Sequence, residues 1–129
     1  MPEIQKVETK NAPPAVGPYS QATRVDGFIF VSGQLPIDPR TGQMVTREIK
    51  AQTARVIDNI EAVLREAGSS LSRVVRCDVF LTDINDFKAM NEVYASKFTG
   101  DPKPARQAFQ VVRLPLDAMI EISCIAHAE

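Results

Sequence analysis

Residues 48–67 carry the clearest secondary-structure signal in the chain, and this signal restricts the folds that the chain can adopt. Hydrophobic positions recur there at helical spacing, and Gly68 follows at the position of a C-terminal cap. A long amphipathic helix has to bury its apolar side against another element. The positions on that side are Ile49, Thr53, Val56, Ile57, Ile60, Val63, Leu64 and Ala67.

Strand-like segments precede and follow this helix. Asp26-Gly27 is a strong turn dipeptide and predicts a hairpin between residues 20–25 and 28–35. A further strand is expected at residues 4–7, and another at 74–82. The length of 129 residues fits a single domain, residues 1–129.

The second half of the chain predicts one more helix and two closing strands. Asp83 is expected to cap the helix, and the closing strands meet near Leu114-Pro115. The order β-β-β-α-β-α-β-β predicts an α+β (α/β) sheet with both helices on one face. The apolar side of the second helix carries Phe87, Met90, Tyr94 and Phe98.

Alternation within the strands divides the sheet into a face beneath the helices and an opposite, mixed face. The mixed face is half apolar and half polar, and two helices cannot also cover it. Exposed apolar sheet faces usually mark interfaces, so we expect a closed homo-oligomer with Glu121 at or near the subunit interface. The helix side should hold Ile29, Val31, Gly33, Leu35, Val75, Cys77, Val79 and Leu81, and the mixed face Phe28, Phe30, Ser32, Gln34, Arg76, Asp78, Phe80, Met119, Glu121 and Ser123.

Charge and composition argue against several classes of function. Fifteen basic and sixteen acidic residues, dispersed along the chain, give no footprint for nucleic acid or a membrane surface. No apolar segment approaches the ~20 residues of a membrane span, and no apolar stretch at the N-terminus is typical of a secretory signal. We therefore expect a cytoplasmic protein.

The sulfur and imidazole groups are too few for a metal site or a disulfide framework. Cys77 and Cys124 both fall in expected strands and are interpreted as buried thiols. His127 is the single histidine, and there is no Cys-x-x-Cys motif. Metal catalysis is therefore not expected.

Two charged residues near the end of the chain are the strongest candidates for chemistry. Arg106 begins a strand after a Pro-rich loop, and a guanidinium can hold a carboxylate through two parallel hydrogen bonds. Glu121 interrupts an apolar strand, and a partly buried carboxylate can order or deprotonate a water molecule. The alternative from the pattern alone is an ion pair, at the surface for Arg106 and at an interface for Glu121.

Weaker candidates accompany these two. Ser32-Gly33 ends a strand on the mixed face, where a glycine lets a substrate approach the backbone N–H. Tyr19 follows a Gly-Pro pair in an irregular loop, and Asn91 interrupts the apolar side of the second helix. Packing alone also explains each of these residues. The chain has no Ser-His-Asp set, phosphate-binding glycine loop or nucleotide fingerprint.

Short segments in a characteristic order run through nearly the whole chain and together resemble the reactive intermediate deaminase family, RidA, also called the YjgF family. Their order and spacing are more specific than any one of them. The segments are Ala-Pro-Pro-Ala-Val-Gly-Pro-Tyr-Ser-Gln-Ala (12–22), Val-Ser-Gly-Gln-Leu-Pro (31–36), Asp-Pro-Arg-Thr-Gly (38–42), Asn-Ile-Glu-Ala-Val-Leu-Arg-Glu-Ala-Gly (59–68), Val-Phe-Leu-Thr-Asp (79–83), Asn-Glu-Val-Tyr (91–94), Pro-Ala-Arg (104–106) and Ile-Glu-Ile (120–122).

The resemblance implies a chorismate-mutase-like fold, with a mixed six-stranded sheet, in a homotrimeric barrel with one site at each subunit interface. It also implies a 2-iminobutanoate/2-iminopropanoate deaminase without cofactor or metal. Such an enzyme hydrolyses enamines and imines that leak from pyridoxal-phosphate enzymes, such as 2-aminoacrylate, to 2-keto acids and ammonia. The same resemblance implies that Arg106 binds the substrate carboxylate and that Glu121 orders the attacking water. The other implied substrate-binding residues are Tyr19, Ser32, Gly33, Asn91 and the backbone of Ala108.

Three departures from the family pattern affect the expected pocket. Gln107 and Ala108 stand where many members have Cys, Ser or Thr, which argues against an essential thiol and leaves a backbone N–H at Ala108. Lys103 stands where many members have an aromatic residue, which bears on pocket shape and substrate range. Ser123 replaces a common second glutamate, so Glu121 is the only carboxylate on its strand.

Two other functions are alternatives on the same scaffold. A non-catalytic carboxylate-binding or stress-interaction protein would use Arg106 and would not need Glu121. A ribonuclease would need a basic groove with exposed aromatic residues, which the balanced charge disfavours. The presence of both Arg106 and Glu121 favours the deaminase.

Overall fold

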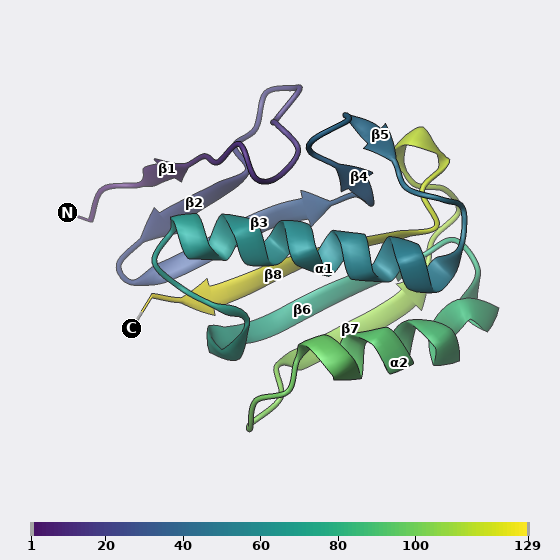
Figure 1. Cartoon of the computed structure of the whole chain (residues 1–129). Helices are drawn as coiled ribbons and strands as arrows, with labels where there is room; N and C mark the ends of the chain where they lie inside the picture. Colours follow the sequence, from purple (N-terminus) through teal and green to yellow (C-terminus); the bar gives the residue numbers. More distant parts are fainter. Residues whose placement is uncertain (1, 129) are drawn as a thin grey trace.

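The computed structural model describes residues 2–128 and shows a twisted sheet with two long helices, α1 and α2, on one face (Figure 1). The main sheet has six strands in the order β1-β2-β3-β8-β6-β7. Its pairs are antiparallel except β6 with β7, which run parallel and are connected through α2. The predicted α+β class and mixed six-stranded sheet are confirmed. The elements are β1 Gln5–Val7, β2 Ala22–Val25, β3 Phe28–Gln34, β4 Ile37–Asp38, β5 Gln43–Met44, α1 Ile49–Glu66, β6 Val74–Leu81, α2 Phe87–Lys97, β7 Ala105–Gln110 and β8 Ile120–His127.

Helix α1 supplies the centre of the core. Its apolar side packs on β3 and β8, and burying each large aliphatic side chain contributes about 1.5–3 kcal/mol. The Glu48 carboxylate caps the helix by accepting hydrogen bonds from the N–H groups of Lys50 and Ala51, both at 2.9 Å. Gly68 ends it with φ 82°, as the sequence predicts. The fully buried side chains of this helix include Val56, Ile57, Ile60, Val63 and Leu64.

The second helix starts later than the sequence indicates. Asp83 accepts a hydrogen bond from the Asn85 N–H at 2.9 Å and so caps a short 3-10 turn, Ile84–Asp86, rather than α2 itself. The apolar side is as predicted, because Met90, Tyr94 and Phe98 are buried and Phe87 packs against the core.

The tight turns follow the predicted chemistry. Asp26 and Gly27 both have positive φ, 51° and 82°, and join β2 to β3 in the predicted hairpin. Gly42, with φ 74°, closes a turn at residues 39–42. This turn joins β4 to β5, a separate hairpin with strands too short to show alternation in the sequence.

The predicted division of the sheet into two faces is wrong at two β-bulges. The register between β3 and β8 shifts between Val31 and Gln34, so Gln34 is buried and Gly33 is exposed, the reverse of the expectation. A second shift at the start of β6 leaves Val75 43% exposed, although it was expected beneath the helices. A bulge adds one residue and reverses the alternation beyond it, and no sequence pattern marked either position.

The face away from the helices is mixed, as expected. Phe28, Phe30 and Phe109 are 47%, 39% and 45% exposed there, and Phe109 packs edge-on against Phe80. On β6 and β8, half-buried residues alternate with buried apolar residues, and the half-buried ones include both polar and apolar side chains. Within residues 2–128, no helix is both long enough and apolar enough to span a bilayer. The closed homo-oligomer stays a prediction.

Candidate functional site

Glu121 lies near the start of β8 and points to the mixed face, opposite Phe80 of β6. Its carboxylate lines a cavity of about 760 Å³ between the sheet and two loops. Tyr19, Ser32 and Gly33 line the same cavity. The structure therefore brings four of the predicted site residues together on one side of the sheet.

The bulge in β3 places Gly33 directly against Glu121. Ser32 and Gly33 both lie opposite Ser123, so the strand bends at this point. A Cβ atom added at position 33 would lie 2.7 Å from Cδ of Glu121. A side chain at this position would displace the carboxylate, so glycine is required here for close approach and not for a positive φ.

The Glu121 carboxylate is half-buried and has no hydrogen-bond or ion-pair partner within residues 2–128. Burial raises the pKa of this carboxyl, and no nearby cation offsets the effect. A carboxylate with a raised pKa is a better proton acceptor near neutral pH.

Ser32 and Tyr19 occupy the edge of the cavity in different ways. The Ser32 hydroxyl donates to the carbonyl oxygen of Ser20 at 2.6 Å, so its proton fixes the adjoining loop and its oxygen stays available as an acceptor. Tyr19 is 52% exposed, and its hydroxyl accepts the Val16 N–H at 3.4 Å. Its ring is therefore presented at the rim.

Gln21 holds the loop that carries Tyr19, and the sequence reasoning missed it. Its side chain is only 3% exposed and donates to the carbonyl oxygens of Thr9, Ala12 and Pro13 at 3.0, 3.3 and 2.8 Å. Its Oε1 atom accepts the Thr9 N–H at 2.7 Å. A lone glutamine between a loop and a strand carries no sequence signal for this role.

Gln21→Ala is expected to lower the free energy of unfolding by about 1–3 kcal/mol, because buried backbone groups lose their partners. Urea denaturation of the variant beside wild type measures the change. Gln43→Ala, at an exposed glutamine of β5, is the matched control and should stay within about 0.5 kcal/mol of wild type. Equal stability of both variants would contradict the anchoring role of Gln21.

Leu116 also lines the Glu121 cavity and was missed. It lies in the connection between β7 and β8 with φ 58°, followed by Asp117 with φ 56°. A leucine in the left-handed region is strained by about 1–3 kcal/mol. Two contacts hold the loop: Arg47 Nη1 donates to the Asp117 carbonyl at 2.7 Å, and Arg113 Nε donates to its carboxylate at 2.8 Å. The sequence gives no signal for a positive φ at these positions.

Arg106 of β7 points the other way, toward α2. Its guanidinium donates to Oδ1 of Asn91 at 2.7 Å and lies 4.7 Å from the ring centroid of Tyr94 and 5.5 Å from that of Phe87. Positions 87, 91 and 94 are neighbours on one helical face, so α2 forms a cradle for the cation. No carboxylate pairs with Arg106 in the described part of the chain, which contradicts the alternative of a surface ion pair.

Within one chain, Arg106 and Glu121 lie on opposite faces of the sheet. Arg106 is opposite Cys77, which faces the helices, whereas Glu121 is opposite Phe80 on the mixed face. Strand β6 separates β7 from β8, so the two strands are not neighbours in the sheet. The candidate residues therefore form two groups, Tyr19, Ser32, Gly33 and Glu121 on one side and Asn91 and Arg106 on the other.

Three residues that depart from the family pattern, Lys103, Gln107 and Ala108, lie close to Arg106 in the sequence. Lys103 borders the same shallow depression of about 390 Å³, and its ammonium donates to the Phe98 carbonyl at 2.8 Å, closing the end of α2. Ala108 packs its methyl group against the core, and Gln107 reaches Asp78 on the mixed face at 3.3 Å. Neither side chain lines either depression, so at Ala108 only the backbone stays a candidate contact.

Both cysteines are buried beneath the helices, as predicted. Burial raises the pKa of Cys77 to about 11 and also raises that of Cys124, so neither is a reactive thiolate at neutral pH. The Tyr94 hydroxyl lies beside the Cys77 thiol and has no well-formed hydrogen bond within residues 2–128.

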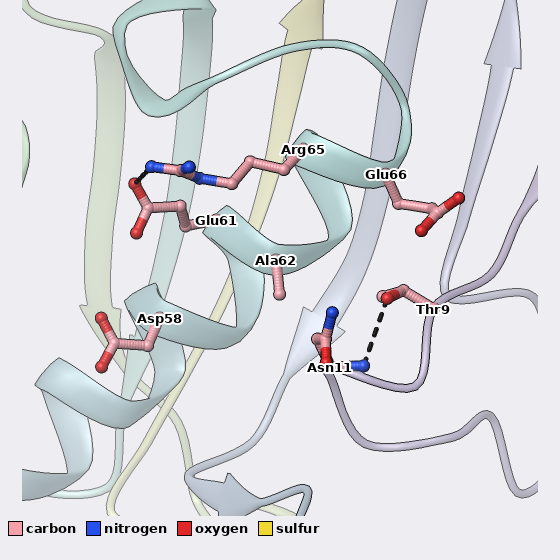
Figure 2. Close-up of a pocket in the computed structure, with 7 residues that line it drawn as sticks. All are labelled: Thr9, Asn11, Asp58, Glu61, Ala62, Arg65 and Glu66. Carbon is pink, nitrogen blue, oxygen red and sulfur yellow. Dashed lines mark hydrogen bonds and ion pairs between the residues drawn. The ribbon is translucent and has the colours of Figure 1, made fainter.

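An acidic groove lies away from both candidate groups, between α1 and the loop after β1 (Figure 2). Figure 2 shows Glu61 directed toward Arg65, and the two side chains form an ion pair at 3.2 Å. Asp58 pairs with Lys97 of α2 at 2.9 Å. Exposed pairs of this kind are solvated, and no group of three or more acidic, cysteine or histidine residues among those described is arranged to hold a metal ion.

Comparisons with known proteins agree with this fold. The family model described as endoribonuclease L-PSP matches residues 9–128. A RutC family protein of Pyrococcus abyssi is 57% identical over 94% of this chain and 94% of its own length. The chloroplastic Reactive Intermediate Deaminase A of Arabidopsis thaliana is 45% identical over 93% of this chain and 64% of its own length. The crystal structure of E. coli TdcF with bound serine has a TM-score of 0.91 and 36% identity, covering 97% of this chain and 99% of that one.

Proposed function

This chain belongs to the YjgF/RutC/Rid family, and we propose that it is a 2-iminobutanoate/2-iminopropanoate deaminase. Its substrates would be reactive 2-imino and 2-enamino acids such as 2-aminoacrylate, which it hydrolyses to 2-keto acids and ammonia. The names of its relatives support this class of reaction. The site residues needed for it are present in the chain.

One observation carries the proposal: within residues 2–128, two opposite charges have no ionic partners, and each lies at its own depression. The Glu121 carboxylate faces one cavity with its pKa raised by burial, and the Arg106 guanidinium is held open by Asn91 and two aromatic rings. A substrate carboxylate fits the guanidinium through two parallel hydrogen bonds. A water molecule fits the carboxylate.

We further propose that each site combines Arg106 of one subunit with Glu121 of the next in a homotrimer. The two residues lie on opposite faces of one sheet, so a single chain cannot present both to one small molecule. Strand β7 is an edge strand, and the mixed face exposes several phenylalanine rings. Both features favour contact with another copy of the chain.

The chemistry needs little beyond positioning and one base. The enamine tautomerises to an imine, whose protonated form is a good electrophile at carbon. Arg106 fixes the substrate carboxylate, and Glu121 takes a proton from water as its oxygen bonds to the imine carbon. The resulting amino alcohol then receives the proton from Glu121 on nitrogen. The Glu121 carboxylate then takes the hydroxyl proton as the C–N bond breaks, which yields the 2-keto acid and ammonia.

The direct test is to generate imines in situ with an amino-acid oxidase and to trap what remains with semicarbazide. The protein concentration that halves semicarbazone formation then measures hydrolysis. Suppression by wild type supports the deaminase. If no imine tested is consumed at any protein concentration, the proposed reaction is wrong.

Mixing two inactive variants tests the shared site. Arg106→Ala and Glu121→Gln subunits, each inactive alone, are unfolded, mixed and refolded together. Every mixed trimer then contains one interface with both native residues, so random assembly at equal amounts restores about a quarter of the wild-type sites. Semicarbazone formation measures the recovery, and each variant refolded alone is the control. Absence of recovery from assembled mixtures would contradict a site shared between subunits.

The alternative function is a non-catalytic protein that binds a carboxylate ligand. The TdcF structure holds serine, an amino acid rather than an imine, and this observation favours the alternative. In that case Arg106 is required for binding and Glu121 is dispensable. Calorimetric titration of wild type and Glu121→Gln with serine, beside the imine assay, distinguishes the two, because a binding protein would bind serine equally well in both and leave every imine intact.

A further inference from the structure

We infer that Leu116 forms a wall for the substrate side chain and sets a preference for 2-imino acids with longer aliphatic groups. The inference rests on the proposed function and adds a specificity residue to it. Leu116 lines the cavity that holds Glu121 and Gly33, and it is 71% exposed there. Its side chain therefore meets solvent at the mouth of the cavity.

More apolar than polar side chains line the cavity. Among the described residues that line it, Glu121 is the one charged residue, and the polar residues are Tyr19, Gln21, Ser32 and Gln34. A substrate whose carboxylate is bound by arginine and whose imine carbon is at Glu121 has only its side chain left to place. The apolar part of the lining consists of Pro13, Pro14, Val16, Leu35, Ile37, Pro115 and Leu116.

Two of these apolar residues stand at the rim on separate loops. Val16 is 86% exposed and lies in the loop after β1, whereas Leu116 lies in the connection before β8. Exposed apolar side chains at a cavity rim gain from a ligand that removes them from water, in proportion to the apolar area that it covers. A branched four-carbon group has more apolar area to place against these side chains than a methyl group has.

The backbone at Leu116 gives an independent reason to assign it a role. Its φ of 58° is unfavourable for a leucine, and Asp117 repeats the conformation. The contacts from Arg47 and Arg113 both reach Asp117, so they fix the loop in this form. Strain of this kind is retained at binding sites when it directs a side chain toward a ligand.

The test compares two imines made by the same oxidase, one from leucine and one from alanine. For Leu116→Ala, the ratio of kcat/KM for the leucine-derived imine to that for the alanine-derived imine is expected to fall about tenfold. Leu116→Gly, which accepts the positive φ, should give the same fall, and Leu116→Met should keep the wild-type ratio. Val112→Ala, at a fully exposed valine in the same connection, is the matched control.

The outcomes separate this inference from its alternatives. Equal losses with both imines would assign Leu116 to loop structure, and a changed oligomeric state without a changed ratio would assign it to a subunit contact. Either result overturns the inference. If wild type hydrolyses neither imine, calorimetric titration with 4-methyl-2-oxopentanoate and pyruvate still tests whether Leu116 contributes to a preference for larger side chains. A tenfold loss in Leu116→Ala of the preference for the larger keto acid would support it, and an unchanged preference would overturn it.

Discussion

Glu121→Gln is expected to lower kcat/KM for imine hydrolysis by about 10²–10⁴-fold, the range for loss of a positioned general base. Glutamine keeps the size of the side chain beside Gly33 and cannot accept the proton from water. In wild type, kcat/KM should fall as the pH drops through the pKa of Glu121, which burial places above its ordinary value of 4.5. Semicarbazone assays across pH measure both effects, and Glu61→Gln, in the acidic groove, is the control. A variant with wild-type activity would show that another group activates the water.

The same substitution is expected to raise the thermal stability of the protein at neutral pH. Burial raises the pKa of Glu121 in the folded state, so the folded chain binds a proton more tightly than the unfolded chain does. Stability therefore falls as the pH rises from the unfolded pKa through the folded one. Tm should be higher for Glu121→Gln than for wild type at pH 7. The difference should vanish below the unfolded pKa, because the carboxyl is then protonated in both states.

Arg106→Ala is expected to lower kcat/KM by about a thousandfold, because two charge-assisted hydrogen bonds to the substrate carboxylate contribute about 1.5–3 kcal/mol each. Arg106→Lys should recover only part of this loss, because an ammonium keeps the charge and lacks the planar fork. Asn91 is expected to orient the guanidinium through the 2.7 Å hydrogen bond that it accepts.

The semicarbazone assay measures both arginine variants, and circular dichroism checks that they fold. Arg65→Ala is the matched control, since Arg65 is an exposed arginine paired with Glu61 on α1. Full activity of Arg106→Ala would place the substrate carboxylate on another group. It would also remove the reason for a site shared between subunits.

Much of the fold follows from local pattern, since each strong signal acts over a few residues. Helix α1, the Asp26-Gly27 hairpin and the cap at Gly68 are set by neighbours in sequence, and all three are as predicted. The bulges in β3 and β6 were not predictable, because each depends on how a partner strand pairs across the sheet. One such bulge exposes Gly33 and buries Gln34.

The sequence predicted which residues belong to the candidate site, and it did not predict how they are arranged in space. Glu121 was identified by its position in an apolar strand, and Tyr19, Ser32 and Gly33 lie beside it. Arg106 was identified by its chemistry, yet strand order alone decides that β6 separates it from β8. The anchoring by Gln21 and the positive φ of Leu116 arise from long-range contacts and loop strain, which leave no periodic trace in a sequence.

The close approach of Gly33 to Glu121 also makes the residue types allowed at these two positions depend on each other during evolution. While the carboxylate occupies its place, position 33 cannot accept even a methyl group, because an added Cβ would lie 2.7 Å from Cδ of Glu121. A side chain can enter at 33 only after the glutamate has been shortened or has moved. A descendant of this chain with alanine or a larger residue at position 33 is therefore expected to hold the carboxylate at position 121 in a different place.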